Sequence, residues 1–200
     1  MHKAPQQRRP TRIAIVDENS VRSAIIESGL REAGYVDIVR ISETTALLKQ
    51  LDALDPDVVL IGLENPSRDI LENMFTVSRM VRRPVAMFVD QSDAAMIEAA
   101  VDAGVSAYIV DGLRKDRVKA ILDMAISRFK AFERLRRELA DAKNQLEERK
   151  IIDRAKGILM KAKSISEEEA YTLLRRAAMN ENRRLAEVAQ SVVLAADLLR

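Results

Sequence analysis

Carboxylates stand directly after short apolar segments in the first half of the chain. Asp17 and Glu18 follow RIAIV, Asp90 follows VAMFV, and Asp111 follows AYIV. Adjacent carboxylates are the hard oxygen ligands that Mg²⁺ uses together with several waters. The ends of neighbouring parallel strands meet at one edge of a sheet, so these side chains are candidates for a shared site. A solvated cluster of acids, with no bound metal, is the alternative that the residues leave open.

The third apolar segment has no oxygen nucleophile near its end. The segment DVVLIGL carries Gly62 near its end, and glycine has no oxygen that could accept a phosphoryl group. Asp57 stands at the opposite end of the segment and Glu64 lies beyond it, so neither carboxylate replaces the missing one. The residues therefore predict an acidic crevice that does not accept phosphate.

Apolar segments alternate with segments of helical periodicity up to residue 126. The apolar segments are residues 12–17, 36–41, 57–63, 84–90 and 106–111. Helical segments that end at Gly34 and Gly104 lie between some of them. Parallel strands require right-handed crossovers, which place helices on both faces of the sheet. We therefore predict an α/β, flavodoxin-like, doubly wound domain with a five-stranded parallel sheet and a site at the carboxyl ends of strands one and three.

The pattern is helical from about Leu113 onward. A short heptad seam with 4,3 spacing predicts a coiled coil that joins two chains, with a helix pair inside one chain as the alternative. The seam residues are Phe132, Leu135, Leu139, Ala142 and Leu146. Three further helices are expected after it, as a small all-α bundle. Ser166 and Glu169 have the spacing of a capping box at the start of the second of these helices.

Composition excludes several classes of function. The chain has no Cys, and its single histidine is His2, so Cys/His zinc sites, disulfides and histidine-based catalysis are excluded. No stretch approaches the length of a membrane span, and the first ten residues contain no apolar core of a signal peptide. We therefore expect a cytoplasmic protein that does not contact membranes.

Charge is distributed unevenly along the chain. Residues 1–12 hold 4 basic and no acidic residues, residues 13–126 hold 12 basic and 19 acidic ones, and residues 127–200 hold 17 basic and 12 acidic ones. An acidic first domain and a basic second one predict different partners, with nucleic acid a candidate for the second. A solvated helical surface would produce the same basic excess, and charge alone does not separate the two interpretations.

Three motifs of the helical end resemble the ANTAR RNA-binding domain of the AmiR/NasT antiterminators. They are AKGILM, SEEEAYTLLRR and AMNENRRLAEVA, in that order. The first domain resembles the NasT branch through PSRD, FVDQSD and GVSAYIVDGL. The resemblance implies a basic flexible tail over 1–11, a receiver-like domain over 12–126, a coiled-coil linker helix over 127–148 and an ANTAR domain over 149–200.

The resemblance also gives the acidic crevice an expected role. Receiver domains carry an acceptor aspartate on strand three, a Thr or Ser on strand four and a Lys on strand five. Motif by motif, these positions fall on Gly62, Val89 and Asp111, so all three groups are absent here. The family usually retains the aspartate, and Gly62 departs from that pattern. Asp17 and Glu18 remain as weak candidates for Mg²⁺, and no other metal or cofactor is expected.

What the resemblance implies is a transcription antiterminator that is not an enzyme. It would bind tandem stem-loops in leader mRNA as a homodimer and would control nitrate or nitrite assimilation genes together with a NasS-like nitrate-sensing protein. The RNA-binding candidates are Lys156, Lys161, Arg175, Arg176, Asn180, Asn182, Arg183, Arg184 and Ala186. Tyr171 could stack on a base, or it could pack in the core with Leu174. The alternative function is a phosphorelay-controlled response regulator with a DNA or protein output.

Overall fold

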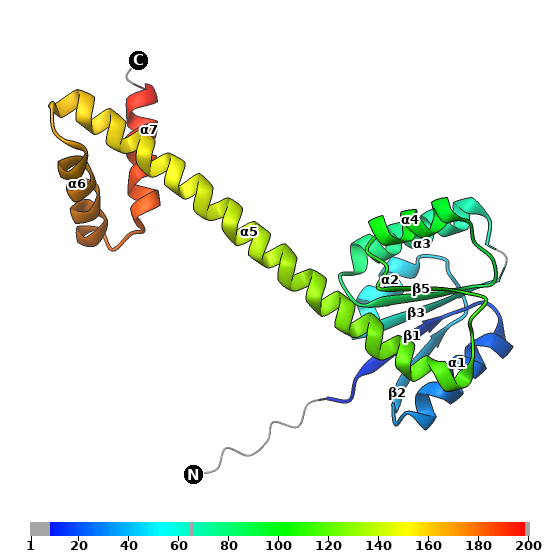
Figure 1. Ribbon diagram of the computed structural model, residues 1–200. Helices are drawn as coiled ribbons and strands as arrows, with labels where there is room; N and C mark the ends of the chain where they lie inside the picture. Colours follow the sequence, from blue (N-terminus) through cyan, green and yellow to red (C-terminus); the bar gives the residue numbers. More distant parts are fainter. Residues whose placement is uncertain (1–8, 65, 199–200) are drawn as a thin grey trace, which may run out of the picture. The chain divides into compact units, whose positions relative to one another are not determined.

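The computed structural model describes residues 9–64 and 66–198 (Figure 1). Most of the basic tail predicted over 1–11, including His2, therefore lies outside the described residues. The chain divides into two compact units, with the boundary between Phe132 and Glu133. None of the helices in the described part of the chain is both long and apolar enough to span a bilayer.

The first unit contains a five-stranded parallel sheet with the order β2-β1-β3-β4-β5. The strands are β1 (Arg12–Val16), β2 (Asp37–Ile41), β3 (Val58–Leu63), β4 (Val85–Val89) and β5 (Ala107–Val110). The crossovers contain α1 (Ser20–Glu32), α2 (Leu47–Leu54), α3 (Arg68–Val81) and α4 (Ala94–Asp102), and the 3₁₀ turn η1 (Lys115–Arg117) follows β5. This architecture confirms the predicted doubly wound α/β fold.

Two apolar layers hold the sheet between helices, because parallel strands are buried on both faces. Phe75 belongs to the layer under α2, α3 and α4, while Phe88 belongs to the layer under α1 and the start of α5 (Val118–Lys163). Figure 1 shows these two groups of helices on opposite faces of the sheet. The order of the strands puts β1 and β3 next to each other at the centre, which is where the sequence placed the site.

The second unit is helical and is built from α5, α6 (Glu167–Asn180) and α7 (Leu185–Leu198). The linker helix and the first helix of the bundle are one continuous helix, since α5 passes through Arg149–Asp153, where the heptad seam ends. The core of the bundle is small. Its buried members are Ala155, Leu174, Ala178, Val188, Ala189 and Val193.

A capping box begins α6, as the sequence predicted. The Glu169 amide donates to the Ser166 hydroxyl at 3.2 Å, and the Ser166 amide donates to the Glu169 carboxylate at 2.8 Å. The hydrogen bond from the Ser166 backbone, and to a smaller extent the one from its side chain, lower the pKa of Glu169 below its usual value. Their stabilisation is therefore present above the ordinary glutamate pKa and is lost as pH falls through the lowered value.

Replacing the cap should destabilise this small bundle measurably. Ser166→Ala removes the hydroxyl that accepts from the Glu169 amide, and we expect it to cost about 1 kcal/mol of unfolding free energy near neutral pH. Urea unfolding followed by circular dichroism measures this loss, which should shrink in acid. Thr172→Ala, at an exposed position within α6, is the control and should cost nothing. Equal effects of the two substitutions would contradict the role of the cap.

Candidate functional site

Asp17 is the buried centre of the crevice at the carboxyl end of the sheet. It follows β1 directly, and none of its side chain is exposed. The Arg22 guanidinium donates to both of its carboxylate oxygens, with Nε–Oδ2 and Nη2–Oδ1 distances of 2.7 and 3.0 Å. The backbone amide of Asn19 donates a third hydrogen bond to the carboxylate, to Oδ1 at 2.9 Å. Asp17 is therefore fully engaged by the protein itself.

Arg22 is a site residue that the sequence analysis missed. It lies in the first turn of α1, and Asn19 caps that helix by accepting from the amides of Val21 and Arg22. The Arg22 side chain is only 11% exposed. Burial lowers the pKa of Arg22, but the hydrogen bond and charge of Asp17, followed by the charges of Asp90 and Glu64, outweigh burial and raise it. A basic residue five positions after a strand-end aspartate was the available signal.

Gly62 lies against this ion pair. A Cβ atom at Gly62 would stand 2.7 Å from Asp17 Cγ and 3.0 Å from Arg22 Nε, and closer still to Asp17 Oδ2. Ordinary carbon contacts are near 3.5–4.0 Å, so even alanine would collide with a short, immobilised side chain. Asp17 and Arg22 thus fill the space beside residue 62, and the absence of a side chain at this glycine is what allows it.

The other predicted crevice residues are arranged less closely. Glu18 accepts a hydrogen bond from the Thr44 hydroxyl at 3.0 Å, and Asp90 lies 3.5 Å from Arg22. Val89 is buried in β4, and Asp111 is exposed after β5. A cavity opens at this edge of the sheet, and neither residue is among the described residues that line it. The described part of the chain contains no cluster of three acidic or histidine side chains that could hold a metal.

In the helical unit, three of the predicted RNA-binding cations are held in ion pairs. Lys156 is 15% exposed and contacts Asp153 and Glu167 at 2.7 and 2.6 Å. Arg183 pairs with Glu181 at 2.9 Å, and Arg184 pairs with Glu187 at 2.8 Å and Glu148 at 3.3 Å. The hydrogen bond with Arg184 also lowers the pKa of Glu187. Phosphate would compete with these carboxylates for the three cations, although the Arg184 side chain is 73% exposed.

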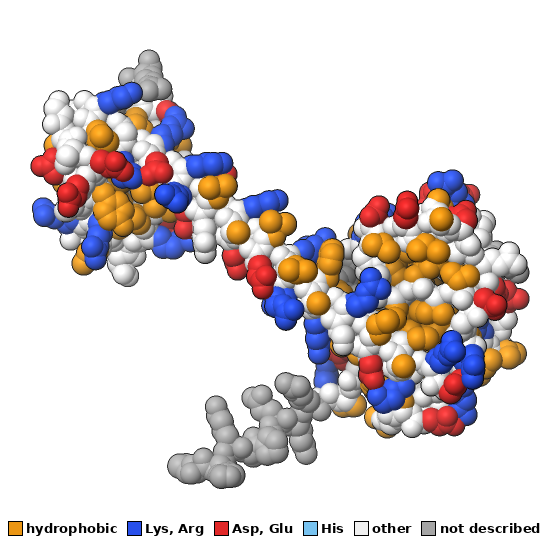
Figure 2. Space-filling view, in the orientation of Figure 1, with side chains coloured by type: hydrophobic (Ala, Val, Ile, Leu, Met, Phe, Trp, Pro, Cys, Tyr) orange, Lys and Arg blue, Asp and Glu red, His pale blue; other side chains and the backbone are white. Residues whose placement is uncertain are grey.

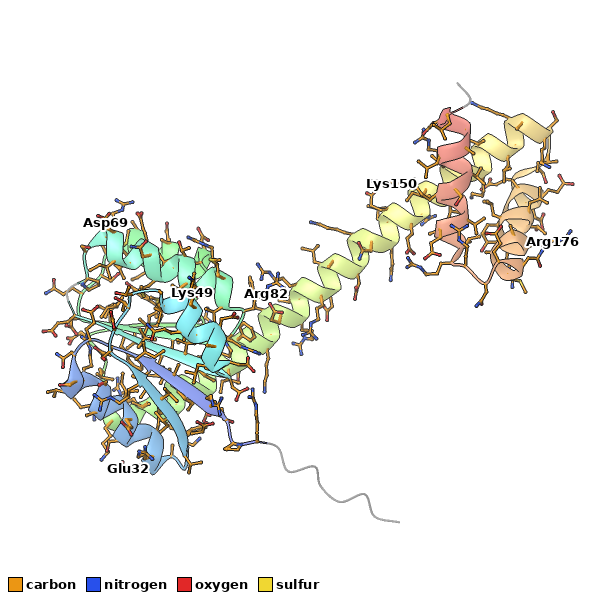
Figure 3. The ribbon with its side chains drawn as sticks, turned by 180° about the vertical axis from the view of Figure 1, so that it is seen from behind. Glu32, Lys49, Asp69, Arg82, Lys150 and Arg176 are labelled. Atoms are coloured by element: carbon orange, nitrogen blue, oxygen red, sulfur yellow. The ribbon has the colours of Figure 1, made fainter. Side chains whose placement is uncertain are left out.

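The remaining predicted cations are exposed. Arg175, Arg176 and Lys161 form no ion pair with any residue that the structure describes. Arg176 lies on α6 opposite the buried residues Leu174 and Ala178, and Arg175 lies on the flank between them. Figure 3 shows Arg176 directed away from α5 and α7. The structure thus separates the six cationic candidates into three that form ion pairs and three that do not.

Uncharged candidates surround the turn between α6 and α7. Asn180 ends α6 and Asn182 adopts a left-handed conformation with φ of 52°, while Ala186 is half-buried in the first turn of α7. Tyr171 is 42% exposed on α6, so it is not enclosed in the core. Figure 2 shows an apolar patch on this unit bordered by charged side chains. The turn presents amide groups that can both donate to and accept from base edges.

The predicted coiled-coil seam runs along the exposed part of α5. Leu135, Leu139 and Leu146 are 59%, 56% and 54% exposed, and Ala142 is exposed between them. Phe132, at the start of the seam, is 57% exposed. A row of large apolar side chains on one helix at heptad spacing is a surface that another helix can cover.

The first unit has the fold of a response-regulator receiver. A CheY-like receiver domain protein from Methanospirillum hungatei aligns with a TM-score of 0.51 and 17% identity, covering 61% of this chain and 98% of that one. The receiver domain of a modulated diguanylate cyclase from Desulfovibrio desulfuricans aligns with a TM-score of 0.50 and 18% identity, covering 60% and 95%. Together with the helical unit, this fold defines a receiver-like protein with a helical output domain.

Residues 140–193 match the ANTAR domain family. The transcriptional regulatory protein PdtaR of Mycobacterium tuberculosis is 27% identical over 184 residues, which cover 92% of this chain and 90% of that protein. The nitrate regulatory protein of Klebsiella oxytoca is 35% identical over 82 residues, which cover 41% and 21%. The chain is an ANTAR-domain transcription regulator of the response-regulator type, with a receiver-like N-terminal domain. Its named relatives are regulatory proteins.

Proposed function

We propose that this chain is an RNA-binding transcription antiterminator whose ANTAR domain binds tandem stem-loops in leader mRNA. Binding would stabilise these stem-loops against a competing terminator hairpin, so that polymerase continues into the operon. The observation that carries the proposal is the ANTAR match over residues 140–193 in a chain that begins with a receiver fold. Such a protein acts where leader mRNA is made, which for this regulator is the cytoplasm.

The proposed RNA face consists of exposed positions on α6, the turn that follows α6, and Lys161 in the last turn of α5. Single-stranded loops are bound through backbone charge, base stacking and contacts to base edges. Arg175, Arg176 and Lys161 supply unpaired charge, Tyr171 supplies an exposed ring, and the turn supplies the amides of Asn180 and Asn182. Ala186 is small enough to let a base approach the start of α7. Lys156, Arg183 and Arg184 contribute less here, because RNA competes with their ion pairs.

Control by a protein partner fits the first unit better than control by phosphate. Gly62 has no oxygen nucleophile, and both carboxylate oxygens of Asp17 already accept hydrogen bonds from Arg22 or Asn19. The nitrate regulatory relative makes nitrate or nitrite assimilation genes the proposed targets, with a NasS-like nitrate-sensing protein as the partner. The receiver-like unit would then serve as a docking surface.

A homodimer is proposed for the RNA-bound form. The exposed leucines of the seam, Leu135, Leu139 and Leu146, would pack against the same residues of a second copy. Two linked ANTAR domains bind two linked stem-loops with a raised effective concentration, so modest single-site affinities are sufficient.

Two arginine pairs with equal charge test the location of the RNA face. We expect Arg175→Ala with Arg176→Ala to weaken binding of a tandem stem-loop RNA and to reduce the slope of log affinity against log salt by one to two units. Arg183→Ala with Arg184→Ala should have a smaller effect, because these side chains are engaged with Glu181, Glu187 and Glu148. Gel shifts over a salt series measure both quantities.

The controls separate location from total charge and from specificity. Lys119→Ala removes one positive charge from the receiver-like unit and should leave affinity unchanged. Equal losses from the two arginine pairs would mean that affinity follows net charge alone, and no loss from Arg175 and Arg176 would exclude the α6 face. Binding of scrambled RNA as tight as that of intact stem-loops would exclude the antiterminator function itself.

A further inference from the structure

A cavity of about 860 Å³ opens beside the filled acceptor position. It lies among the carboxyl ends of β1 and β3 and the helices α2 and α3, where doubly wound folds bind ligands. Volumes of about 300–1,000 Å³ are typical of small-molecule sites in proteins. The cavity is therefore large enough for a small organic ligand, although the phosphate chemistry of a receiver is blocked at its edge.

The walls of this cavity are mainly apolar. Leu47 and Leu48 of α2 face it together with Leu63 of β3 and Ile70 and Met74 of α3. A second hollow, of about 320 Å³, shares Leu48 and Lys49 with the first and continues along α2 toward Met80. The apolar lining of the larger cavity suits an aliphatic or aromatic body.

The end of the cavity near the strands carries excess negative charge. Asp17 is neutralised by Arg22, whereas Glu18 and Glu64 also line the cavity and accept hydrogen bonds only from neutral donors. The Thr44 hydroxyl donates to Glu18 at 3.0 Å, and the side-chain amide of Asn19 donates to Glu64 at 2.7 Å. Arg22 interacts electrostatically with Glu64 but forms its ion pairs with Asp17 and Asp90, and no described cation forms an ion pair with Glu18 or Glu64. The two glutamates therefore retain a net attraction for a cation.

A positive charge, that of Lys49, lies on the α2 side of the cavity. Lys49 is exposed on α2, where Figure 3 labels it, and no ion pair joins it to any described residue. The cationic end of a ligand would thus be drawn to Glu18 and Glu64 and away from Lys49. A phosphate or carboxylate near the strand ends would meet repulsion from the same two glutamates.

We propose that this cavity binds an elongated small molecule with an apolar body and a protonated amine. The body lies on Leu47, Leu63 and Met74, and the amine lies between Glu18 and Glu64. A divalent metal is a poorer occupant, because Asp17 gives both carboxylate oxygens to Arg22. The proposal goes beyond RNA binding: it gives the receiver-like unit a ligand in place of a phosphoryl group, and it does not depend on the function of the ANTAR domain.

Three probes with one body and different head groups test the polarity of the site. Octylammonium, 1-octanol and octanoate are titrated into the ¹⁵N-labelled full-length protein, and amide shifts are followed by NMR. We expect saturable binding of octylammonium, with shifts concentrated in α2, α3 and the end of β3, and at least tenfold weaker binding of octanoate. Glu18→Gln with Glu64→Gln should remove this difference between the probes.

Two matched substitutions test the location. Ile70→Trp places a large ring at the mouth of the cavity and should abolish octylammonium binding, whereas Ile97→Trp on α4 should not; the native side chains are 45% and 44% exposed. Absence of saturable octylammonium binding, equal binding of all three probes, or equal effects of the two tryptophans would each overturn the proposal. An unchanged unfolding midpoint shows that either variant is folded.

Discussion

Gly62→Asp is expected to destabilise the receiver-like unit by about 3 kcal/mol or more, and not to create a phosphorylation site. The new Cβ would collide with Asp17 Cγ at 2.7 Å, and the new carboxylate would stand against a buried carboxylate. Asp17 cannot turn aside cheaply, because Arg22 and Asn19 hold both of its oxygens. Replacing the missing family residue would therefore disrupt the site that took its place.

Chemical unfolding and intact-mass measurement test this expectation together. Gly62→Ala should lose part of the same stability from the steric conflict alone, and Gly62→Asp should lose more because it adds charge. Gly157→Ala is the matched control: Gly157 is helical with nothing within 4 Å of an added Cβ, so alanine should stabilise α5 by about 0.5–1 kcal/mol. A stable Gly62→Asp variant that gains a phosphoryl group from acetyl phosphate and Mg²⁺ would contradict our account of the crevice.

Arg22→Met should have an effect of similar size for a different reason. Methionine keeps the aliphatic bulk of arginine but leaves the fully buried Asp17 carboxylate without its cation. Breaking a buried ion pair from one side costs about 3–5 kcal/mol, because the remaining charge is uncompensated. We expect a loss near the lower end of this range, since the Asn19 amide still donates to Asp17.

A double-mutant cycle separates this charge effect from lost packing. Asp17→Asn combined with Arg22→Met should be more stable than Arg22→Met alone, because the unpaired charge has been removed. Arg31→Met is the surface control: Arg31 pairs with Glu27 one turn away and is 54% exposed, so its loss should cost at most about 0.5 kcal/mol. Similar losses for Arg22→Met and Arg31→Met would show that the internal pair contributes little.

The first unit retains the strand arrangement and the acidic residue at the carboxyl end of its sheet. The sheet still brings the ends of β1 and β3 together, and the acidic residue after β1 is still there. The partner of this aspartate is the Arg22 guanidinium of the same unit. A pair that is internal and buried does not depend on a phosphate donor, which is consistent with control by a partner or a ligand.

Much of the fold could be predicted because it depends on local patterns. Apolar segments that alternate with helical ones require a parallel, two-faced sheet, and the five predicted strands match the observed ones to within two residues at each end. The capping box at Ser166 was visible because both of its partners lie within one turn. The sequence separated a linker helix over 127–148 from three further helices, but the first of these is continuous with the linker in α5, since loss of a heptad pattern does not interrupt backbone hydrogen bonds.

The candidate sites were predicted only in part. Residue types alone determined that no phosphoryl acceptor stands at Gly62 and that positive charge collects in the helical end. Which arginines form ion pairs was decided by tertiary contacts, such as the pair between Arg184 and Glu148, which are 36 residues apart. Periodicity carries no information about such pairs.

The sequence by itself determined the class of fold, the order of the domains and the missing nucleophile, because each depends on residue types at short spacing. Only the tertiary structure decided that Asp17 and Arg22 fill the space beside Gly62 and that a cavity remains between α2 and α3. Both depend on how the crossovers pack β1 against β3 and on the direction in which α1 aims Arg22. Those are distances through space, and no periodicity along the chain encodes them.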